Sequence, residues 1–256
     1  MVLPRALQRL ASVSAGPLLV AGCAAHAVDV PGVGGHGEIV TRPGARGIVV
    51  AAPHGTSDVR TGEIATEIAR RTGFGLVVAT GFTFEADGRQ GPVRRYQVNR
   101  PFEGVPGRPA TDETPSEPAR RVYDAYERDV RAVARGPLLF YVEIHGNNRG
   151  ESAERIEIAT VGIDRHEAAR LRTLAQLIRD AHLAAAAGAP RLDVLVEPAD
   201  PVRYTASGAK RDGILRLPER ALHIELPRAA RTRFRDVYTA ILAQFLAESA
   251  TLPPAP

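Results

Sequence analysis

The sequence predicts an α/β fold, in which a single domain has a mostly parallel mixed sheet with helices on both faces. Six short apolar runs bounded by Gly, Pro or polar residues have the composition of strands. Amphipathic helical patterns lie between these runs, and strands that alternate with helices form parallel sheets covered on both faces. A chain of 256 residues with 44% apolar residues is long enough to build one complete core.

The predicted strands are the apolar runs themselves. Several are nearly continuous in Val, Ile and Leu, which is typical of strands buried on both faces. The six runs are GIVVAAP (47–53), GLVVAT (75–80), LLFYVEIHG (138–146), RIEIATVG (155–162), LDVLVEP (192–198) and ALHIELP (221–227). The segment from Thr83 to Thr114 is rich in Gly, Pro, Arg and Glu and is too long for a plain connector, so we expect it to be functional or disordered.

Four helices are predicted from the spacing of apolar residues and from end signals. Gly73 and Gly136 are expected to end the first two, because glycine adopts the left-handed conformation at helix ends. The start signals are Thr61 as a cap, the capping-box sequence TPSE (114–117) and Asp164 with Glu167, while the fourth helix carries the apolar face of residues 234–245.

The N-terminal sequence MVLPRALQRLASVSAGPLLVAGC has the order of a secretory signal. Two arginines precede an apolar-leaning run and then small residues. The last four residues, Val20-Ala21-Gly22-Cys23, resemble the lipobox of bacterial lipoproteins, in which the cysteine is lipidated and becomes the mature N-terminus. Cys23 is the only cysteine in the chain, so no intramolecular disulfide can form.

These features predict a lipoprotein signal peptide over residues 1–22, a linker over 23–37 and one globular domain over 38–250. The mature protein would be exported and anchored through lipidated Cys23 to a bacterial membrane, on its periplasmic side or at the cell surface. An ordinary cleaved signal or a short N-terminal helix is the alternative. No later segment approaches the roughly 18 apolar residues of a membrane span.

Charge and motif content exclude several other functions. The net charge of +4 is spread among residues of both signs and only 5% of residues are aromatic, so we expect no nucleic-acid partner. The chain has no G-x-S-x-G motif, and its one cysteine lies in the signal, which argues against a serine or thiol nucleophile. No glycine-rich nucleotide motif follows a predicted strand.

Two histidines follow or end predicted strands at the same edge of the sheet. His54 comes directly after GIVVAAP, with Asp58 four residues later, and His145 ends LLFYVEIH. In open α/β sheets, ligands bind beyond the carboxyl ends of the strands. Two imidazoles and a carboxylate provide the three protein ligands of a catalytic zinc site, which leaves one position for water. We therefore predict one Zn²⁺ per chain on His54, Asp58 and His145, with Glu63 as the alternative carboxylate ligand.

The motifs resemble those of the N-formylglutamate amidohydrolase group, which is related to zinc carboxypeptidases and poly-γ-glutamate hydrolases. The resemblance covers residues 47–149, with PHGTSD, TGEIA, NRP and EIHGN in order, and HIELP near the end. It implies a zinc carboxypeptidase-like fold, a zinc hydrolase domain over 38–250 and the same three zinc ligands. The sequence departs from the group at Gly146, where a serine usually follows the second histidine.

Glu225 is the candidate catalytic base. It lies at the carboxyl end of ALHIELP, at the predicted site edge, and the resemblance implies a glutamate base at the end of a late strand. A salt bridge to Arg228 is the alternative role. On the same strand face as His145, Glu143 is expected either to orient that histidine or to make a plain buried hydrogen bond. His223 could line the pocket or be an ordinary core histidine.

The resemblance also suggests how a substrate is held. In the carboxypeptidases an Asn-Arg pair binds the terminal carboxylate of the substrate, and Asn99-Arg100 matches it. A guanidinium binds a carboxylate through two parallel hydrogen bonds, so Arg100 suits this role.

The sequence thus predicts a zinc-dependent hydrolase of an amide bond next to a carboxylate, anchored in the cell envelope. Its substrate would be a small carboxylate-bearing amide or a peptide. Because an envelope protein has no obvious supply of N-formylglutamate, we expect short peptides, acyl amino acids or cell-wall stem peptides instead. The alternative is a non-catalytic metal- or ligand-binding lipoprotein with the same fold.

Overall fold

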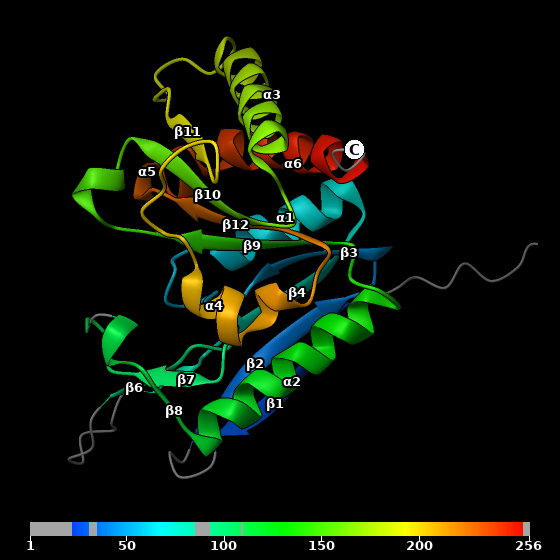
Figure 1. Cartoon of the computed structure of the whole chain (residues 1–256), viewed down its shortest axis with the longest axis vertical. Helices are drawn as coiled ribbons and strands as arrows, with labels where there is room; N and C mark the ends of the chain where they lie inside the picture. Colours follow the sequence, from blue (N-terminus) through cyan, green and yellow to red (C-terminus); the bar gives the residue numbers. More distant parts are fainter. Residues whose placement is uncertain (1–21, 31–34, 85–92, 109, 253–256) are drawn as a thin grey trace, which may run out of the picture.

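The computed structural model describes residues 22–30, 35–84, 93–108 and 110–252. An eight-stranded sheet runs through the centre of this part of the chain (Figure 1). Four of its seven strand pairs are parallel, which confirms the predicted mixed and mostly parallel sheet. In spatial order the strands are β1 (Ala24–Val30), β2 (Gly35–Arg42), β4 (Phe74–Thr80), β3 (Ala45–Ala52), β9 (Phe140–Gly146), β12 (Arg220–Leu226), β10 (Arg155–Val161) and β11 (Asp193–Val196).

All six predicted apolar runs form strands of this sheet, namely β3, β4, β9, β10, β11 and β12. Consecutive residues of one strand enter different cores, because side chains alternate between the two faces. Val50 packs in the core on one face, whereas Val49 and Ala51 pack in the core on the other. Burial on both faces explains why these strands are continuously apolar.

Helices cover both faces of the sheet, as predicted (Figure 1). The first core is shared with α1 (Thr61–Thr72), α3 (Arg165–Leu183) and α6 (Arg235–Thr251), and the second with α2 (Glu117–Ala134). Two short helices, α4 (Ser207–Asp212) and α5 (Arg228–Arg231), flank β12 in the sequence. Single 3₁₀ turns occupy Ala110–Asp112, Gly150–Ser152 and Ile214–Arg216.

Of the predicted helix ends, Gly73 of α1 and Asp164 of α3 are confirmed. In α2 the cap is Ser116, so Thr114 and Glu117 do not form the predicted capping box, and Arg135, one residue before the predicted Gly136, takes the left-handed conformation that ends the helix, with φ of 55°. Oγ of Ser116 and Oδ1 of Asp164 accept hydrogen bonds from backbone N–H groups of the first turns of α2 and α3. Gly73 ends α1 in the left-handed conformation, with φ of 75°. Thr61 is the first residue of α1 instead of its cap, and its Oγ1 donates to the Asp58 carbonyl oxygen at 2.8 Å. This bond joins the start of α1 to the loop that carries the candidate metal ligands.

The prediction of a linker over residues 23–37 is wrong. Ala24–Val30 form β1, which pairs antiparallel with β2 from Gly35 onward. Val28 and Val30 pack against the core on the α2 face. An edge strand has one partner and is half exposed, so two valines and small residues are sufficient to form it. Cys23, directly before β1, is exposed, and residues 1–21 of the predicted signal lie outside the described residues.

The long segment after β4 contains a second, small sheet. Its strands are β5 (Thr83–Phe84), β6 (Arg94–Tyr96), β7 (Phe102–Gly104) and β8 (Thr114–Pro115), all paired antiparallel. Tyr96 and Val98 from this segment are buried in the core on the α2 face. The segment is therefore a folded layer that holds residues 97–100 close to the main sheet.

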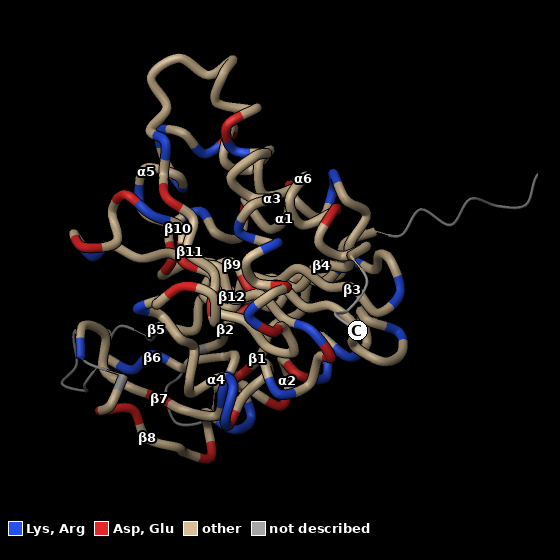
Figure 2. Tube along the Cα trace, turned by 45° about the horizontal axis from the view of Figure 1, so that its top comes forward, with Lys and Arg blue, Asp and Glu red and all other residues tan. Residues whose placement is uncertain are grey.

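Basic and acidic residues are mixed along the chain (Figure 2). Many are paired within one helix, as Arg70 and Arg71 are with Glu67 in α1. Among the described helices, none has the length and apolar character needed to cross a membrane.

Candidate metal centre

Three neighbouring strands bring the predicted site residues to one edge of the sheet. β3, β9 and β12 lie side by side and run parallel, so their carboxyl ends meet at this edge. The loop after β3 carries His54 and Asp58, while β9 carries His145 and β12 carries Glu225. In the register of β9 and β12, His145 lies opposite Glu225.

The three predicted zinc ligands form one cluster. Nδ1 of His54 lies 3.5 Å from Oδ2 of Asp58, and Nδ1 of His145 lies 3.3 Å from the same oxygen. One donor atom from each of the three residues lies within 4.8 Å of the other two, so the group could hold a metal ion. Asp58 and His145 are 87 residues apart in the sequence, and the neighbouring parallel strands β3 and β9 bring them together.

The second nitrogen of each histidine has its own acceptor. Nε2 of His54 lies 3.2 Å from the Gln97 carbonyl oxygen, and Nε2 of His145 lies 3.1 Å from Oε2 of Glu143. With Nε2 facing an acceptor, Nδ1 is the ring nitrogen of each histidine that faces Asp58 and is available to ligate a metal. Metal-binding histidines have this arrangement, with the non-ligating N–H donated to a carbonyl or carboxylate. The donor set therefore fits a divalent metal.

The electrostatics of the cluster favour a positive charge. Burial alone would lower the pKa of His145, but its hydrogen bonds to Asp58 and Glu143 raise it to about 10. Burial would raise the pKa of Asp58, yet hydrogen bonds from His145 and His54 hold it well below its usual range. Burial and hydrogen bonds oppose each other at Glu143 in the same way, and its pKa is also held low. Both carboxylates are therefore ionised at neutral pH.

A second group of possible metal ligands shares His145 with the first. Donor atoms of Glu143, His145 and His223 also lie within 4.8 Å of one another, and all three residues are buried. The Glu143 oxygens already accept hydrogen bonds from Tyr141 Oη at 3.2 Å and from Asn99 Nδ2 at 3.2 and 3.3 Å. Nδ1 of His223 lies 3.0 Å from Oε2 of Glu143. Glu143 thus contacts the predicted ligand His145, as expected for an orienting residue.

The two carboxylate oxygens of Glu225 differ in their contacts. Its Oε1 lies 3.3 Å from Nε2 of His223, whereas its buried Oε2 has no hydrogen-bond partner among the described residues. No ion pair joins Glu225 to Arg228 in this part of the chain, so the alternative salt bridge does not form here. The unpaired oxygen fits a carboxylate that acts on a ligand.

The alternative carboxylate ligand, Glu63, is not part of the cluster. It lies in the first turn of α1, and its side chain is 59% exposed and pairs with Arg235. Asp58 is therefore the carboxylate that the fold places with His54 and His145.

The predicted carboxylate clamp is only partly available. Asn99 is fully buried and its amide donates to Glu143, so a substrate contact would require this bond to break. Nε and Nη2 of Arg100 donate to Oε2 of Glu113 at 3.2 and 2.7 Å. Nη1 of Arg100 makes only a 3.4 Å contact with Oδ1 of Asn99. Glu113 therefore fixes one edge of the guanidinium and leaves the Nη1 side for another partner.

Arg231 is a site residue that the sequence did not reveal among 33 basic residues. Its guanidinium is buried and donates to three backbone carbonyl oxygens, those of Leu226 at 3.1 Å, Val59 at 2.8 Å and Asn147 at 2.9 Å. Leu226 is the last residue of β12, and Val59 and Asn147 lie in the loops that follow β3 and β9. Arg231 thus joins the three segments that carry the metal centre.

The same guanidinium explains Gly146, where the similar family usually has serine. A Cβ atom on Gly146 would lie 2.4 Å from Cζ of Arg231, which is closer than real contacts allow. Burial lowers the pKa of Arg231, although the negative charges of Asp58 and Glu225 nearby raise it. A side chain at position 146 would therefore require the Arg231 guanidinium to move, so the two positions are sterically coupled.

Glu157 and Tyr204 are two further residues that the sequence patterns did not single out. Glu157 lies opposite Glu225 in the register of β10 and β12, and its Oε2 accepts hydrogen bonds from the backbone N–H groups of Arg203 and Tyr204 at 2.6 and 3.2 Å. Burial, and next the negative charge of Glu225, raise the pKa of Tyr204. A charged residue inside the apolar run RIEIATVG was the available signal.

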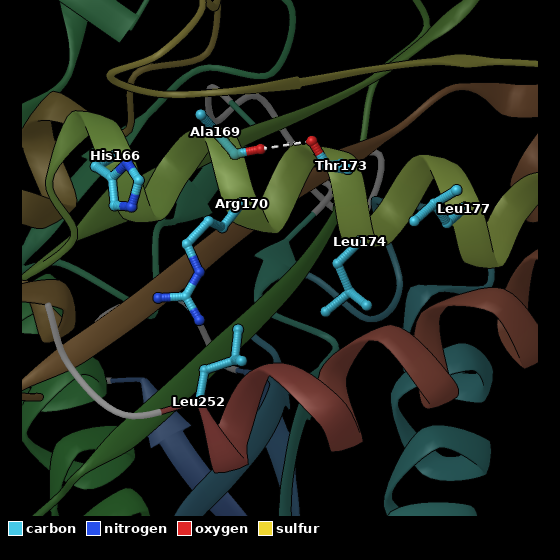
Figure 3. A pocket seen from close by; sticks show the side chains of 7 residues that line it. All are labelled: His166, Ala169, Arg170, Thr173, Leu174, Leu177 and Leu252. Atoms are coloured by element: carbon cyan, nitrogen blue, oxygen red, sulfur yellow. Dashed lines mark hydrogen bonds between the residues drawn. The ribbon is translucent and has the colours of Figure 1, made fainter.

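A surface hollow of about 450 Å³ lies elsewhere, between α3 and the end of α6 (Figure 3). Leu174, Leu177 and Leu252 line it, together with the aliphatic part of Arg170. It contains none of the candidate site residues.

No family model and no curated protein matches the chain. Similar solved structures include a bacteriophage poly-γ-glutamate hydrolase, with 14% identity, a TM-score of 0.48 and coverage of 85% of this chain and 89% of that chain. An aspartoacylase family protein from Mesorhizobium loti has 15% identity, a TM-score of 0.43 and coverage of 94% and 71%. A metallo-carboxypeptidase from Burkholderia cenocepacia has 14% identity and a TM-score of 0.41, and this chain, aligned over 88% of its residues, spans 65% of it.

Proposed function

We propose that this chain is a metal-dependent hydrolase that cleaves an amide bond next to a carboxylate. One observation carries the proposal. Nδ1 of His54 and Nδ1 of His145 converge on Oδ2 of Asp58. Glu225 lies opposite His145 on the next strand, with one oxygen that has no partner within the described part of the chain. Three metal donors beside an unpaired carboxylate are what hydrolysis of an amide by an activated water requires.

The metal is best placed on His54, Asp58 and His145. The side chains of His54 and Asp58 are 13% and 17% exposed, so a substrate can approach this group from solvent. The alternative group centres on Glu143, which is fully buried and already accepts several hydrogen bonds. Two imidazoles and a carboxylate suit zinc, which when bound would polarise the scissile carbonyl and lower the pKa of a water molecule.

Glu225 would act as the base. Its Oε2 accepts a proton from the attacking water as the new C–O bond forms, and returns it to the amine nitrogen as the C–N bond breaks. Its Oε1 lies within hydrogen-bond reach of His223, which fixes the carboxylate while the other oxygen reacts. Arg100 would bind the substrate carboxylate through its Nη1 side, while Glu113 holds the opposite edge of the guanidinium.

We also propose that the enzyme is lipid-anchored in the cell envelope through Cys23. The lipobox-like sequence and the exposed position of Cys23 support this proposal. Substrates would then be envelope compounds that pair an amide with a carboxylate.

Metal content and turnover together test the proposal. Purified protein lacking residues 1–22 should contain close to one zinc per chain by mass spectrometry and should hydrolyse acyl-glutamates or C-terminal glutamyl peptides. His54→Ala and His145→Ala should each remove most of the metal, whereas His166→Ala, an exposed histidine of α3, should retain it. Full zinc retention in both ligand variants would refute the site. Zinc binding without turnover of any of these compounds would favour the non-catalytic alternative.

A further inference from the structure

Asn147 presents an amide without partners beside the candidate metal centre. It is 4% exposed, and neither Oδ1 nor Nδ2 has a hydrogen-bond partner among the described residues. Its backbone is fixed, because its N–H donates to the Leu226 carbonyl at 3.0 Å and its carbonyl accepts from Arg231 at 2.9 Å. A buried amide that has lost water without gaining a partner is unfavourable, and such groups are rare in folded proteins. The arrangement is consistent with an amide kept for a ligand.

The Asn147 side chain lies on the same face of the sheet as His145. A Cβ on the intervening Gly146 would point at the Arg231 guanidinium, on the opposite face. Asn147 continues the pairing of β9 with β12 through its bond to Leu226. Side chains alternate along an extended chain, so His145 and Asn147 both face the candidate site.

Along β9, the position that Asn99 contacts and Asn147 lie on opposite sides of His145. Asn99, next to Arg100, contacts Glu143, two residues before His145 along β9. Asn147 lies two residues after His145, or about 6–7 Å further in the strand direction. If the substrate carboxylate is bound by Arg100 on the Asn99 side and the scissile bond lies at the candidate metal centre, the acyl part extends in the strand direction, toward Asn147.

We infer that Asn147 binds an amide group in the acyl part of the substrate, so that the enzyme acts on peptides rather than on N-formyl amino acids. The inference rests on the proposed function. An N-acylated dipeptide or a longer peptide has one more backbone amide beyond the scissile bond, and its N–H and C=O complement Oδ1 and Nδ2 of Asn147. A formyl group ends at the scissile carbonyl carbon and cannot reach this residue.

Two substrates of matched length test the inference. N-acetyl-L-alanyl-L-glutamate has an amide in its acyl part, and N-pentanoyl-L-glutamate has the same number of main-chain atoms without one. Wild-type enzyme should prefer the acetyl-alanyl compound by about ten- to a hundredfold in kcat/KM, as two hydrogen bonds allow. Asn147→Leu, of similar size, should abolish this preference and leave kcat/KM for the pentanoyl compound within about twofold.

The stability of the same variant separates a binding role from a structural one. Because the Asn147 amide has no partner among the residues that the structure describes, Asn147→Leu should keep or raise Tm and retain zinc. A fall in Tm of several degrees, or an equal loss of kcat/KM on both compounds, would overturn the inference. If wild-type protein hydrolyses neither compound, the proposed function fails. In that case the inference is tested by calorimetry, which measures the affinity of wild-type protein and of Asn147→Leu for both compounds. Asn147→Leu should weaken binding of the acetyl-alanyl compound alone.

Discussion

Replacing Arg231 by methionine should weaken both the fold and metal binding. Methionine keeps the apolar stem and removes the guanidinium, which donates four hydrogen bonds, three to backbone carbonyls and one to Oδ1 of Asn148. At about 1 kcal/mol each, their loss would cost roughly 4 kcal/mol. Relief of the buried charge offsets part of this cost, so we expect a net loss of about 3 kcal/mol.

The assay is thermal and chemical denaturation of the metal-free protein, followed by zinc competition with a chelator. For a domain of this size, about 3 kcal/mol corresponds to a fall in Tm of roughly 6–12 °C. Two of the released carbonyls, of Val59 and Asn147, lie within two residues of the ligands Asp58 and His145. Looser ligand loops should reduce zinc affinity by about ten- to a hundredfold, as the loss of supporting contacts does in other metal sites.

The matched control is Arg228→Met in the same short helix, α5. Arg228 is exposed, so this change should cost less than about 0.5 kcal/mol. A stability loss no larger than that of Arg228→Met, or unchanged zinc affinity, would show that Arg231 does not hold the loops together.

A double-mutant cycle with Gly146 sharpens the test. Gly146→Ala should destabilise the wild-type protein, because its Cβ would meet the guanidinium at 2.4 Å. In the Arg231→Met background this clash involves a flexible side chain and should be smaller. Simple additivity of the two changes would contradict the contact between these residues.

The remaining predictions concern the base, the clamp, acid stability and location. Glu225→Gln should keep zinc and lower kcat by at least about a hundredfold, because an amide cannot accept the proton; near-normal turnover would place the base elsewhere. Arg100→Lys should chiefly raise KM for carboxylate substrates, and an equal KM increase for the corresponding carboxamides would argue against a clamp. Hydrogen bonds from Arg179 and Arg191 lower the pKa of Asp180 from 3.8 to about 2, so their stabilisation is full above pH 4 and is lost as pH falls toward 2. The Asp180 side chain is 43% exposed, so Asp180→Asn should cost only about 0.5 kcal/mol at pH 7, with a difference that shrinks below pH 4; a cost independent of pH would exclude the ionic contribution. Cys23→Ser should move the protein from the membrane to the soluble fraction in cells, and an unchanged distribution would refute the anchor.

Buried strands and their ends were the most predictable features of this chain. Six apolar runs predicted six of the eight strands of the main sheet, and the positions of His54 and His145 after or at the end of such runs predicted where they meet. The edge strand β1 was missed because a half-exposed strand needs few apolar residues. The small sheet of β5 to β8 was missed because its strands are only two or three residues long.

Contacts between distant segments were the features that sequence patterns could not supply. Asn99 and Glu143 are 44 residues apart, and Val59 and Arg231 are 172 apart. Nothing in the sequence distinguishes Glu113 from the other acidic residues, and only the fold shows that it pairs with Arg100. Local periodicity reports which face a residue occupies, whereas these partners depend on how the loops are brought together.

Strand β1 also sets the distance between a lipid on Cys23 and the candidate metal centre. It begins at Ala24, directly after Cys23, and is hydrogen-bonded to β2 along its whole length. A lipid on Cys23 would therefore be attached directly to the edge strand of the sheet, with no flexible linker between them. β1 is four strands from β9, and at about 4.8 Å per strand this is roughly 19 Å across the sheet. An enzyme mounted in this way would work at a fixed height above the bilayer, on molecules that come to the membrane surface.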